Sequence, residues 1–140
     1  MNIEGQHIIL DIYGCNPTIL DDMDYLEHLC EKVANNTNME VLYTYFHQFY
    51  PHGVTGMLVL STSHLSIHTW PEKGYASLDF YTCGDRNIET QVEILLKGLE
   101  SSHAIVYFIA RGTTYPQIIK GNHVSIRDFS PTENPDKQGD

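Results

Sequence analysis

The residues from Leu60 to Glu72 place hydroxyl, imidazole, indole and carboxylate side chains within one short apolar run. The run reads Leu-Ser-Thr-Ser-His-Leu-Ser-Ile-His-Thr-Trp-Pro-Glu. Side chains alternate between the two faces of a β-strand, so Leu65 and Ile67 should point to a core. The residues around them should point the other way: His64, Ser66, His68 and Trp70. Hydroxyl and imidazole groups supply nucleophiles and proton-transfer bases, so the non-core face of this strand is predicted to carry a functional site.

A second run, from Tyr75 to Gly84, has the same alternation of apolar and polar residues. The two runs are separated by Pro71-Glu72-Lys73-Gly74, whose composition favours a turn, so they are predicted to form an antiparallel hairpin. If Trp70 faces Tyr75, the register matches apolar residues with one another. It then pairs Leu65 with Phe80, Ile67 with Leu78, His68 with Ser77, and Thr62 with Cys83. This register predicts that the thiol of Cys83 lies near the Thr62–Ser63 peptide bond.

The size and charge of the chain limit its class. Its 140 residues carry 18 acidic and 8 basic side chains, for a formal net charge of −10. This length fits one domain, which we expect over residues 1–129, followed by a polar, flexible tail over residues 130–140. Nucleic-acid binding is disfavoured, because it depends on lysine and arginine neutralising phosphates. A small cationic substrate is electrostatically compatible with the acidic chain.

The sequence also indicates where the chain resides. It lacks a basic N-terminal segment, and no run approaches the roughly 18 apolar residues of a membrane span. We therefore expect a cytoplasmic protein without membrane contact. The three cysteines, Cys15, Cys30 and Cys83, are odd in number and unrelated in spacing, which fits reduced thiols. We assign Cys15 and Cys30 to packing.

The remaining pattern consists of short apolar runs and two amphipathic segments. Strands are expected over residues 7–13, 41–50, 54–60 and 104–110, the last strand of the chain, and helices over 20–33 and 88–99. Gly56 within a strand indicates a close backbone approach or a bulge. Hairpins with segregated helices predict an α+β two-layer sandwich, in which two main helices cover one face of a mostly antiparallel sheet. The other face should carry His64, His68, Trp70 and Cys83.

The histidines of this face allow two further interpretations. A metal site would use His64 and His68, with His47, His52 or Cys83 as additional ligands. Residues four apart on a strand are about 13 Å apart at roughly 3.3 Å per residue, which is too far to share a zinc ion, so we expect no metal. Alternatively, the histidines merely satisfy hydrogen bonds beneath a lid or at a subunit contact.

Several stretches of the chain together resemble a known family. They are Gly53-Val54-Thr55-Gly56, the run from Ser61 to Glu72, Gly74-Tyr75-Ala76-Ser77 and Tyr81-Thr82-Cys83-Gly84, supported by Leu10-Asp11-Ile12-Tyr13-Gly14-Cys15 and Phe46-His47-Gln48-Phe49. In these residues the chain resembles the prokaryotic S-adenosylmethionine decarboxylase family. The resemblance is close over the first 85 residues and extends to the others by architecture.

The resemblance implies a proenzyme that cuts itself between Thr62 and Ser63 into residues 1–62 and 63–140. Ser63 would attack the Thr62 carbonyl and become a covalent pyruvoyl group. His68 would be the base for this processing and Thr55 would supply a hydroxyl. The pyruvoyl group would form a Schiff base with the amine of S-adenosylmethionine and accept the electrons released as carbon dioxide leaves.

The resemblance also implies roles in substrate binding and turnover. Cys83 would return a proton to the substrate carbon. Glu72 would bind the ribose hydroxyls, and Phe49 would stack on the adenine, either in its own chain or from a neighbouring subunit. The product would be the aminopropyl donor for spermidine, and the expected assembly is a homodimer of cleaved protomers with sites near the interface.

Two positions depart from the family pattern. The family usually has Glu where this chain has Thr62, and Ser where it has Thr55. Two alternatives follow: a pyruvoyl-dependent decarboxylase of another amino acid, such as ornithine or arginine, and an unprocessed, non-catalytic regulatory relative. Glu72 and Phe49 favour a nucleoside substrate over a simple amino acid.

Overall fold

One antiparallel sheet forms the centre of the molecule. The computed structural model describes residues 3–84, 86–114 and 121–129, so the predicted tail over residues 130–140 lies outside the described residues. The strand order is β2-β3-β4-β5-β1-β6-β7, and every neighbouring pair is antiparallel. The strands are β1 (Gly5–Tyr13), β2 (Val41–Gln48), β3 (Val54–Leu60), β4 (His64–Trp70), β5 (Tyr75–Cys83), β6 (His103–Arg111) and β7 (Gly121–Ser125).

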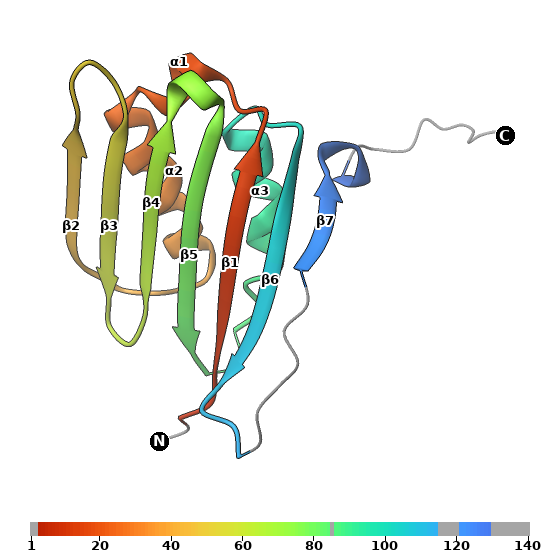
Figure 1. Cartoon of the computed structure of the whole chain (residues 1–140). Helices are drawn as coiled ribbons and strands as arrows, with labels where there is room; N and C mark the ends of the chain where they lie inside the picture. Colours follow the sequence, from red (N-terminus) through yellow and green to blue (C-terminus); the bar gives the residue numbers. More distant parts are fainter. Residues whose placement is uncertain (1–2, 85, 115–120, 130–140) are drawn as a thin grey trace, which may run out of the picture.

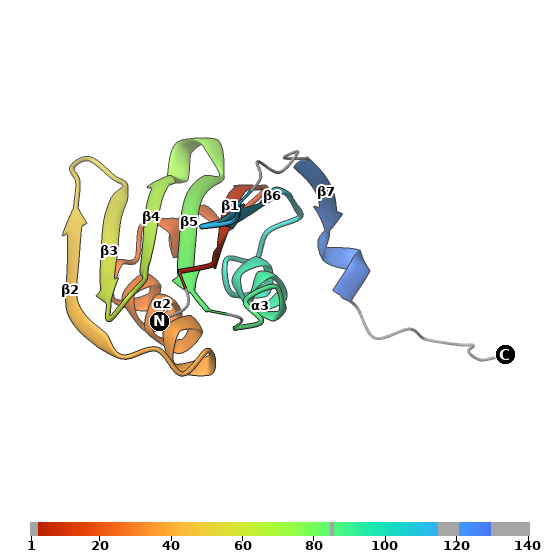
Figure 2. The same cartoon turned by 90° about the horizontal axis from the view of Figure 1, so that it is seen from below.

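Helices cover one face of this sheet. They are α1 (Pro17–Leu20), α2 (Met23–Asn36) and α3 (Thr90–Gly98), and Figures 1 and 2 show α2 and α3 side by side behind the strands. The predicted α+β sandwich is therefore confirmed. Among the helices formed by the described residues, none is long and apolar enough to cross a membrane.

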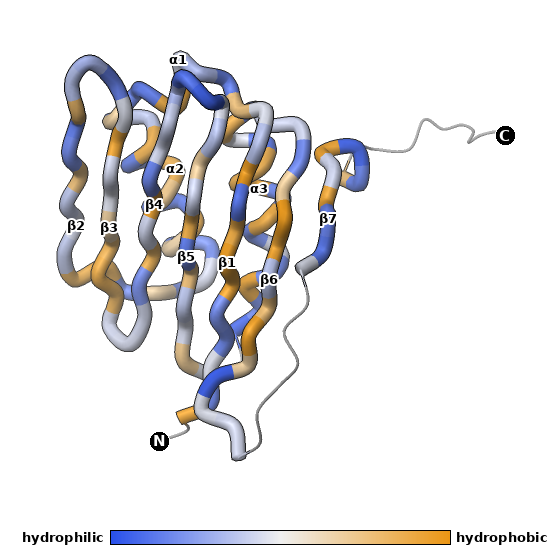
Figure 3. Tube along the Cα trace, in the orientation of Figure 1, coloured by the Kyte–Doolittle hydropathy of each residue, from blue (hydrophilic) through white to orange (hydrophobic). Residues whose placement is uncertain are grey.

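The hydrophobic core lies between the sheet and the helices. In β3, β4 and β5 every second residue is buried, and Figure 3 shows hydrophobic and hydrophilic segments interspersed along the strands. Buried strand residues include Ile8, Leu10, Leu65 and Ile67, and buried helix residues include Leu26, Cys30, Val33, Leu95 and Leu96. None of the helices within the described residues covers the opposite face of the sheet, which is here called the open face. It carries His64, Ser66, His68 and Trp70 of β4, as the alternation predicted.

The β4–β5 hairpin has the predicted register. Leu65 pairs with Phe80, Ile67 with Leu78, His68 with Ser77 and Trp70 with Tyr75. A single 3₁₀ turn, η1 (Pro71–Lys73), joins the strands and ends at Gly74, whose φ of 60° suits glycine. The ladder begins at the His64–Tyr81 pair, so Thr62 lies before β4 and the predicted Thr62–Cys83 pair is absent from it.

The close approach predicted at Gly56 is confirmed. Gly56 pairs with Phe46 of β2, and a Cβ atom built on Gly56 would overlap the Phe46 ring. The glycine therefore lets the aromatic ring of the edge strand cover the neighbouring backbone and reach the core.

The predicted helix over residues 20–33 is wrong at both ends. Two aspartates interrupt it, because Asp22 accepts a hydrogen bond from the backbone N–H of Tyr25 at 3.1 Å and so caps a new helix. Leu20 instead ends the short α1, and α2 continues to Asn36. The other helix is shorter than predicted, since α3 spans Thr90–Gly98 within the expected 88–99.

Two other boundaries also differ from prediction. Strand β2 ends at Gln48, two residues before the predicted end. Residues 104–110 are not the last strand, because β7 follows and pairs with β6 at the sheet edge. The sequence of β7, Gly-Asn-His-Val-Ser, lacks the apolar alternation of a half-buried strand, so the pattern gave no signal for it. A 3₁₀ turn, η2 (Ile126–Phe129), follows β7.

Candidate functional site

Ser63 lies in the turn between β3 and β4, at the lower end of the sheet in Figure 1. Its hydroxyl oxygen accepts a hydrogen bond from the backbone N–H of Cys83 at 3.4 Å. Its carbonyl oxygen accepts a hydrogen bond from the Leu60 N–H at 3.0 Å, which closes the turn. Ser63 is buried, whereas Thr62 before it is exposed. Although Thr62 is outside the ladder, the backbone of Cys83 contacts Ser63, as the register predicted. The closeness of the Cys83 thiol to the Thr62–Ser63 bond stays a prediction.

Thr55 and His68 face each other on neighbouring strands, nearer the upper end of the sheet. The two residues are paired in the β3–β4 ladder, and Thr55 Oγ1 lies 2.9 Å from His68 Nδ1 in a hydrogen bond. The methyl group of Thr55, which a serine would lack, does not prevent this contact. A threonine at this position can therefore form a hydroxyl–imidazole pair with His68.

The Thr55–His68 pair lines a cavity of about 360 Å³, here called the His68 pocket. Its lining residues come from the end of β2, the β2–β3 turn, β3, β4 and η1: Phe49, His52, Gly53, Thr55, His68, Thr69, Trp70 and Glu72. His52 Nε2 lies 3.1 Å from Glu72 Oε1. The pocket thus brings together four of the predicted site residues, Phe49, Thr55, His68 and Glu72.

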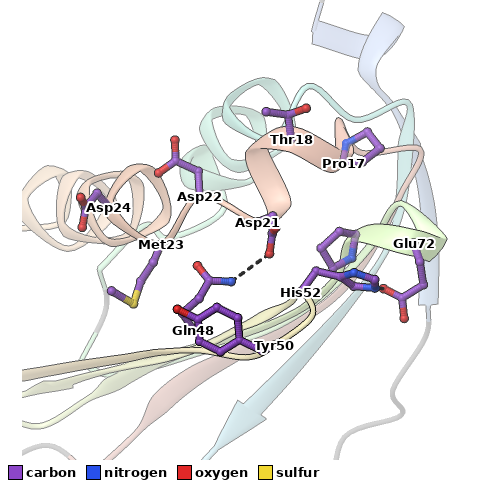
Figure 4. Close-up of a pocket in the computed structure, with 11 residues that line it drawn as sticks. Pro17, Thr18, Asp21, Asp22, Met23, Asp24, Gln48, Tyr50, His52 and Glu72 are labelled. Atoms are coloured by element: carbon purple, nitrogen blue, oxygen red, sulfur yellow. Dashed lines mark hydrogen bonds and ion pairs between the residues drawn. The ribbon is translucent and has the colours of Figure 1, made fainter.

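A larger cavity, of about 880 Å³, adjoins the His68 pocket, and the two share His52 and Glu72 as lining residues. Figure 4 shows Asp21 pointing to Gln48 and His52 pointing to Glu72 across this space. The Asp21 carboxylate accepts hydrogen bonds from the Gln48 side chain and the Gly53 N–H, both at 2.8 Å. These two bonds hold the β2–β3 turn, and with it one wall of the His68 pocket, against α1.

The two groups of candidate residues lie at different ends of the sheet. Ser63 and His68 are five positions apart along an extended chain, which corresponds to about 16 Å at roughly 3.3 Å per residue. His68 pairs with Ser77, which lies six residues before Cys83 on β5, or about 20 Å at the same rise per residue, so His68 is also far from Cys83. Within one chain, the structure does not bring His68 and Thr55 to the Thr62–Ser63 bond, where the resemblance requires a base and a hydroxyl.

No metal centre forms from the candidate ligands. Over residues 3–84, 86–114 and 121–129, no group of three or more His, Cys, Asp and Glu side chains is arranged to hold a metal ion.

Comparison with known proteins decides the family. The family model described as S-adenosylmethionine decarboxylase matches residues 6–112, a stretch that contains every candidate site residue. The chain belongs to the S-adenosylmethionine decarboxylase family. It is 42% identical over 113 residues to the S-adenosylmethionine decarboxylase proenzyme of Pyrococcus abyssi, which covers 80% of this chain and 81% of that protein. The proenzyme of Clostridium tetani is 50% identical over 86 residues, or 61% of this chain and 68% of that protein.

A solved structure supports the same assignment. The crystal structure of the adenosylmethionine decarboxylase from Aquifex aeolicus superposes with a TM-score of 0.74 at 31% sequence identity. The match covers 84% of this chain and 98% of the Aquifex chain. The open antiparallel sheet with helices on one face is therefore the architecture of this decarboxylase family.

The structure adds residues to the candidate site that the sequence did not single out. Tyr81 lies two positions before Cys83 on the same face of β5, and its hydroxyl oxygen is 3.4 Å from Cys83 Sγ. His7 of β1 and Arg111 of β6 lie beside Tyr81. The alternation of β5 could have indicated Tyr81. Identifying His7 and Arg111 would have required the strand order, in which β1 lies between β5 and β6. The sequence pattern alone does not provide that order.

His7 predicts a pH dependence of stability. Burial lowers the pKa of His7 below its ordinary 6.5. The Asp79 carboxylate opposes this effect, and Arg111 and His64 each lower the pKa by a smaller amount. The unfolded chain therefore binds the proton first, so this stabilisation is present above about pH 6.5 and is lost as the pH falls through the lower, folded pKa. We expect the free energy of unfolding, measured with urea at pH 7.5 and 5.5, to fall less in His7→Gln than in the wild type.

The matched control is His28→Gln, because His28 is exposed on α2. It should leave the pH dependence of the unfolding free energy unchanged. An identical slope in His7→Gln and wild type would contradict the assignment of this effect to His7.

Proposed function

We propose that this chain is a self-processing decarboxylase of S-adenosylmethionine that cuts itself between Thr62 and Ser63. The observation that carries the proposal is the contact between Ser63 and Cys83 inside the stretch that matches the family. Ser63 Oγ lies 3.4 Å from the Cys83 backbone nitrogen, so a nucleophilic hydroxyl and the residue that carries the proton-donating thiol share one end of the sheet. The product is the aminopropyl donor for spermidine synthesis.

The residues at this turn fit a pyruvoyl group made from Ser63. The side chain is held at the end of the sheet, and the Cys83 N–H is a donor to the oxygen that attacks and later leaves. The Leu60 N–H fixes the Ser63 carbonyl, which would remain beside the new chain end. Once formed, the pyruvoyl group supplies an electron sink for loss of carbon dioxide.

The other residues then have distinct tasks. The imidazole of His68, oriented by the Thr55 hydroxyl at 2.9 Å, is the base that removes the Ser63 Cα proton during processing. The Thr55 hydroxyl is a donor to the oxygen that develops charge when Ser63 attacks Thr62. Cys83 returns a proton to the substrate carbon after carbon dioxide has left.

These tasks require two chains. A base about 16 Å along the strand cannot take a proton from Ser63 directly, because general-base catalysis needs heavy atoms within about 3 Å or one bridging water. We therefore propose a homodimer in which Ser63 and Cys83 of one chain meet Thr55, His68, Phe49 and Glu72 of the other.

The open face provides a surface for such a dimer. It exposes a patch of large apolar side chains, with relative exposures of 40–62%: Tyr43, Tyr45, Met57, Val59 and Trp70. Contiguous apolar patches on a sheet commonly mark interfaces. A two-fold axis in the interface and perpendicular to the strands would place the lower end of one sheet against the upper end of the other. Both composite sites would then form at once.

Glu72 is the proposed ribose-binding residue, and its surroundings suit that role. It lies at the end of β4 in η1, where it lines both cavities, and His52 at 3.1 Å orients one of its carboxylate oxygens. The larger cavity also has Asp21, Asp22 and Asp24 among its lining residues, which favours a cationic substrate such as S-adenosylmethionine over an anion. Phe49 in the same pocket offers a ring for adenine stacking.

The substrate is tested by release of carbon dioxide from carboxyl-labelled S-adenosylmethionine, ornithine and arginine, in wild type and Glu72→Gln. We expect release from S-adenosylmethionine alone. Glu72→Gln should raise its Michaelis constant by about 10- to 100-fold, the worth of one or two hydrogen bonds to a charged group. Its chain cleavage should remain normal.

The matched control is Glu93→Gln, because Glu93 lies on α3 and pairs with Lys97 away from the open face. It should leave the Michaelis constant unchanged. Release of carbon dioxide from ornithine or arginine, with no effect of Glu72→Gln, would favour the amino-acid decarboxylase. An intact chain that releases none from any of the three would favour the non-catalytic relative.

A further inference from the structure

Four side chains from four strands gather on the open face beside Cys83. The rings of His7 on β1, His64 on β4 and Tyr81 on β5 form a triangle, with all three ring centroids 5.7–6.1 Å apart. Arg111 of β6 completes the group, with Cζ 5.2 Å from the centre of the Tyr81 ring. We call these four residues the Tyr81 cluster. None of them has a part in the mechanism proposed above.

We propose that Tyr81 is a positioning residue, which holds the Cys83 thiol beside Ser63 and donates a hydrogen bond to sulfur once the thiol has lost its proton. The inference rests on the proposed function, because it concerns the proton that Cys83 gives to the substrate carbon.

The geometry connects Tyr81 to Ser63 through Cys83. Tyr81 Oη is 3.4 Å from Cys83 Sγ, and the Cys83 nitrogen is 3.4 Å from Ser63 Oγ. Gly5, the β1 partner of Cys83, leaves room for this arrangement, since a Cβ there would lie 3.3 Å from both the Tyr81 hydroxyl and a ring carbon. The phenol therefore lies across the Gly5 backbone, with its hydroxyl at the sulfur atom.

The charges around Tyr81 favour a donating hydroxyl. The hydrogen bond with Cys83 raises the pKa of Tyr81, with a further rise from burial and an opposing effect of Arg111. A phenol whose pKa lies above its ordinary 10 keeps its proton at neutral pH. It can then donate to a thiolate, which is an acceptor without a proton of its own.

The remaining charged groups near Cys83 come from several elements. Arg111 Nη1 donates to His7 Nδ1 at 3.3 Å, since a guanidinium is only a donor, so His7 carries its proton on Nε2. That nitrogen is buried without a hydrogen-bond partner and lies 3.9 Å from the Asp79 carboxylate. Arg86, after β5, donates to the Cys83 carbonyl at 3.2 Å. Two permanent cations thus lie near this site: Arg111 over the Tyr81 ring and Arg86 at the Cys83 main chain.

The step balances without a further reactant. The S–H bond of Cys83 breaks, a C–H bond forms at the substrate carbon, and the electron pair stays on sulfur. The thiolate then accepts the hydrogen bond of Tyr81, and the Arg111 cation across the ring reduces the cost of the new charge. A proton from water restores the thiol before the next turnover.

The test measures the alkylation rate of Cys83 by iodoacetamide, with peptide mass spectrometry, across pH 6–10. The thiolate is the reacting form, so loss of the Tyr81 donor should slow the reaction. In Tyr81→Phe we expect the alkylation rate at neutral pH to fall about tenfold, equivalent to about 1.4 kcal/mol. The whole profile of rate against pH should move to higher pH. Cys15 and Cys30 serve as internal references, because burial raises the pKa of each to about 12.

The matched control is Tyr75→Phe, which removes a hydroxyl from the same strand that bonds to Asp11 at 2.7 Å. It should leave Cys83 alkylation unchanged. An unchanged or faster rate in Tyr81→Phe would overturn the inference. Repeating the measurement in the Ser63→Ala background makes the test independent of processing and turnover. The alkylation result then tests the role of Tyr81 even if the proposed decarboxylase function is wrong.

A second readout ties the effect to turnover. Tyr81→Phe should cut its chain normally and keep the Michaelis constant, while the turnover number falls several-fold. A variant that alkylates slowly but turns over at the wild-type rate would also overturn the role of Tyr81 in proton return. If no chain releases carbon dioxide from S-adenosylmethionine while the alkylation rate still falls, the proposed function fails and the contact with the thiol stands.

Discussion

Ser63→Ala should yield a single uncut chain of 16.0 kDa that releases no carbon dioxide from S-adenosylmethionine. Alanine removes the hydroxyl that attacks the Thr62 carbonyl, so neither the acyl shift nor the pyruvoyl group can form. The measurement is a denatured mass spectrum together with the decarboxylation rate. In the wild type the same spectrum should show residues 1–62 and a second fragment from position 63 onward, blocked at its first residue.

The control for this variant is Ser61→Ala, in the same turn and two residues earlier. The Ser61 backbone N–H donates to the Glu40 carbonyl at 3.2 Å, a bond that alanine keeps, so the turn should be preserved and cleavage should proceed. Decarboxylation by an intact Ser63→Ala chain would end the pyruvoyl hypothesis, because activity would then need another electron sink.

The second large effect concerns the pairing of chains. Two differently tagged chains, Ser63→Ala and His68→Ala, should each be inactive alone. In the purified mixed dimer, the His68→Ala chain still has Ser63 and receives His68 from its partner. We therefore expect that chain to be cut and the dimer to have about half the wild-type activity, since one of the two symmetric sites is complete.

The matched control places both substitutions in one chain and pairs it with the wild type. If each site combines two chains, this mixed dimer has one defect in either site and should be uncut and inactive. If each site belongs to one chain, the outcomes are reversed: the double variant with wild type is half-active, and the first pair is inactive. The proposal of a shared site thus stands or fails on the comparison of two dimers with the same composition.

The local geometry of the site could be predicted from the sequence, because it depends on strand alternation and one short turn. The register of the hairpin placed Cys83 near Ser63, and the ladder and the Ser63–Cys83 contact confirm it. The same strand spacing that argues against a shared metal at His64 and His68 also separates Ser63 from His68. The resemblance supplied residue roles without distances, so it did not reveal this separation.

Contacts between distant strands were beyond sequence reasoning. Arg111 of β6 contacts Tyr81 of β5 across β1, which lies between these two strands. No local sequence pattern encodes this strand order. The edge strand β7 was missed for a different reason: its side chains are mostly exposed, so burial did not select an alternating sequence. The split between α1 and α2 depends on the capping bond of Asp22, which competes with helix continuation at a position of otherwise helical composition.

The position of β1 has a consequence for the cut chain as a folding system. Cleavage after Thr62 would leave β1 to β3 on one fragment and β4 to β7 on the other, yet β1 is hydrogen-bonded on both sides to strands of the second fragment, and β3 to β4. The fragments are interleaved and cannot separate without losing the sheet. Before the cut, folding is a unimolecular search. After it, renaturation becomes a bimolecular encounter whose yield depends on fragment concentration, so an unfolded mature molecule recovers far less readily than its own precursor.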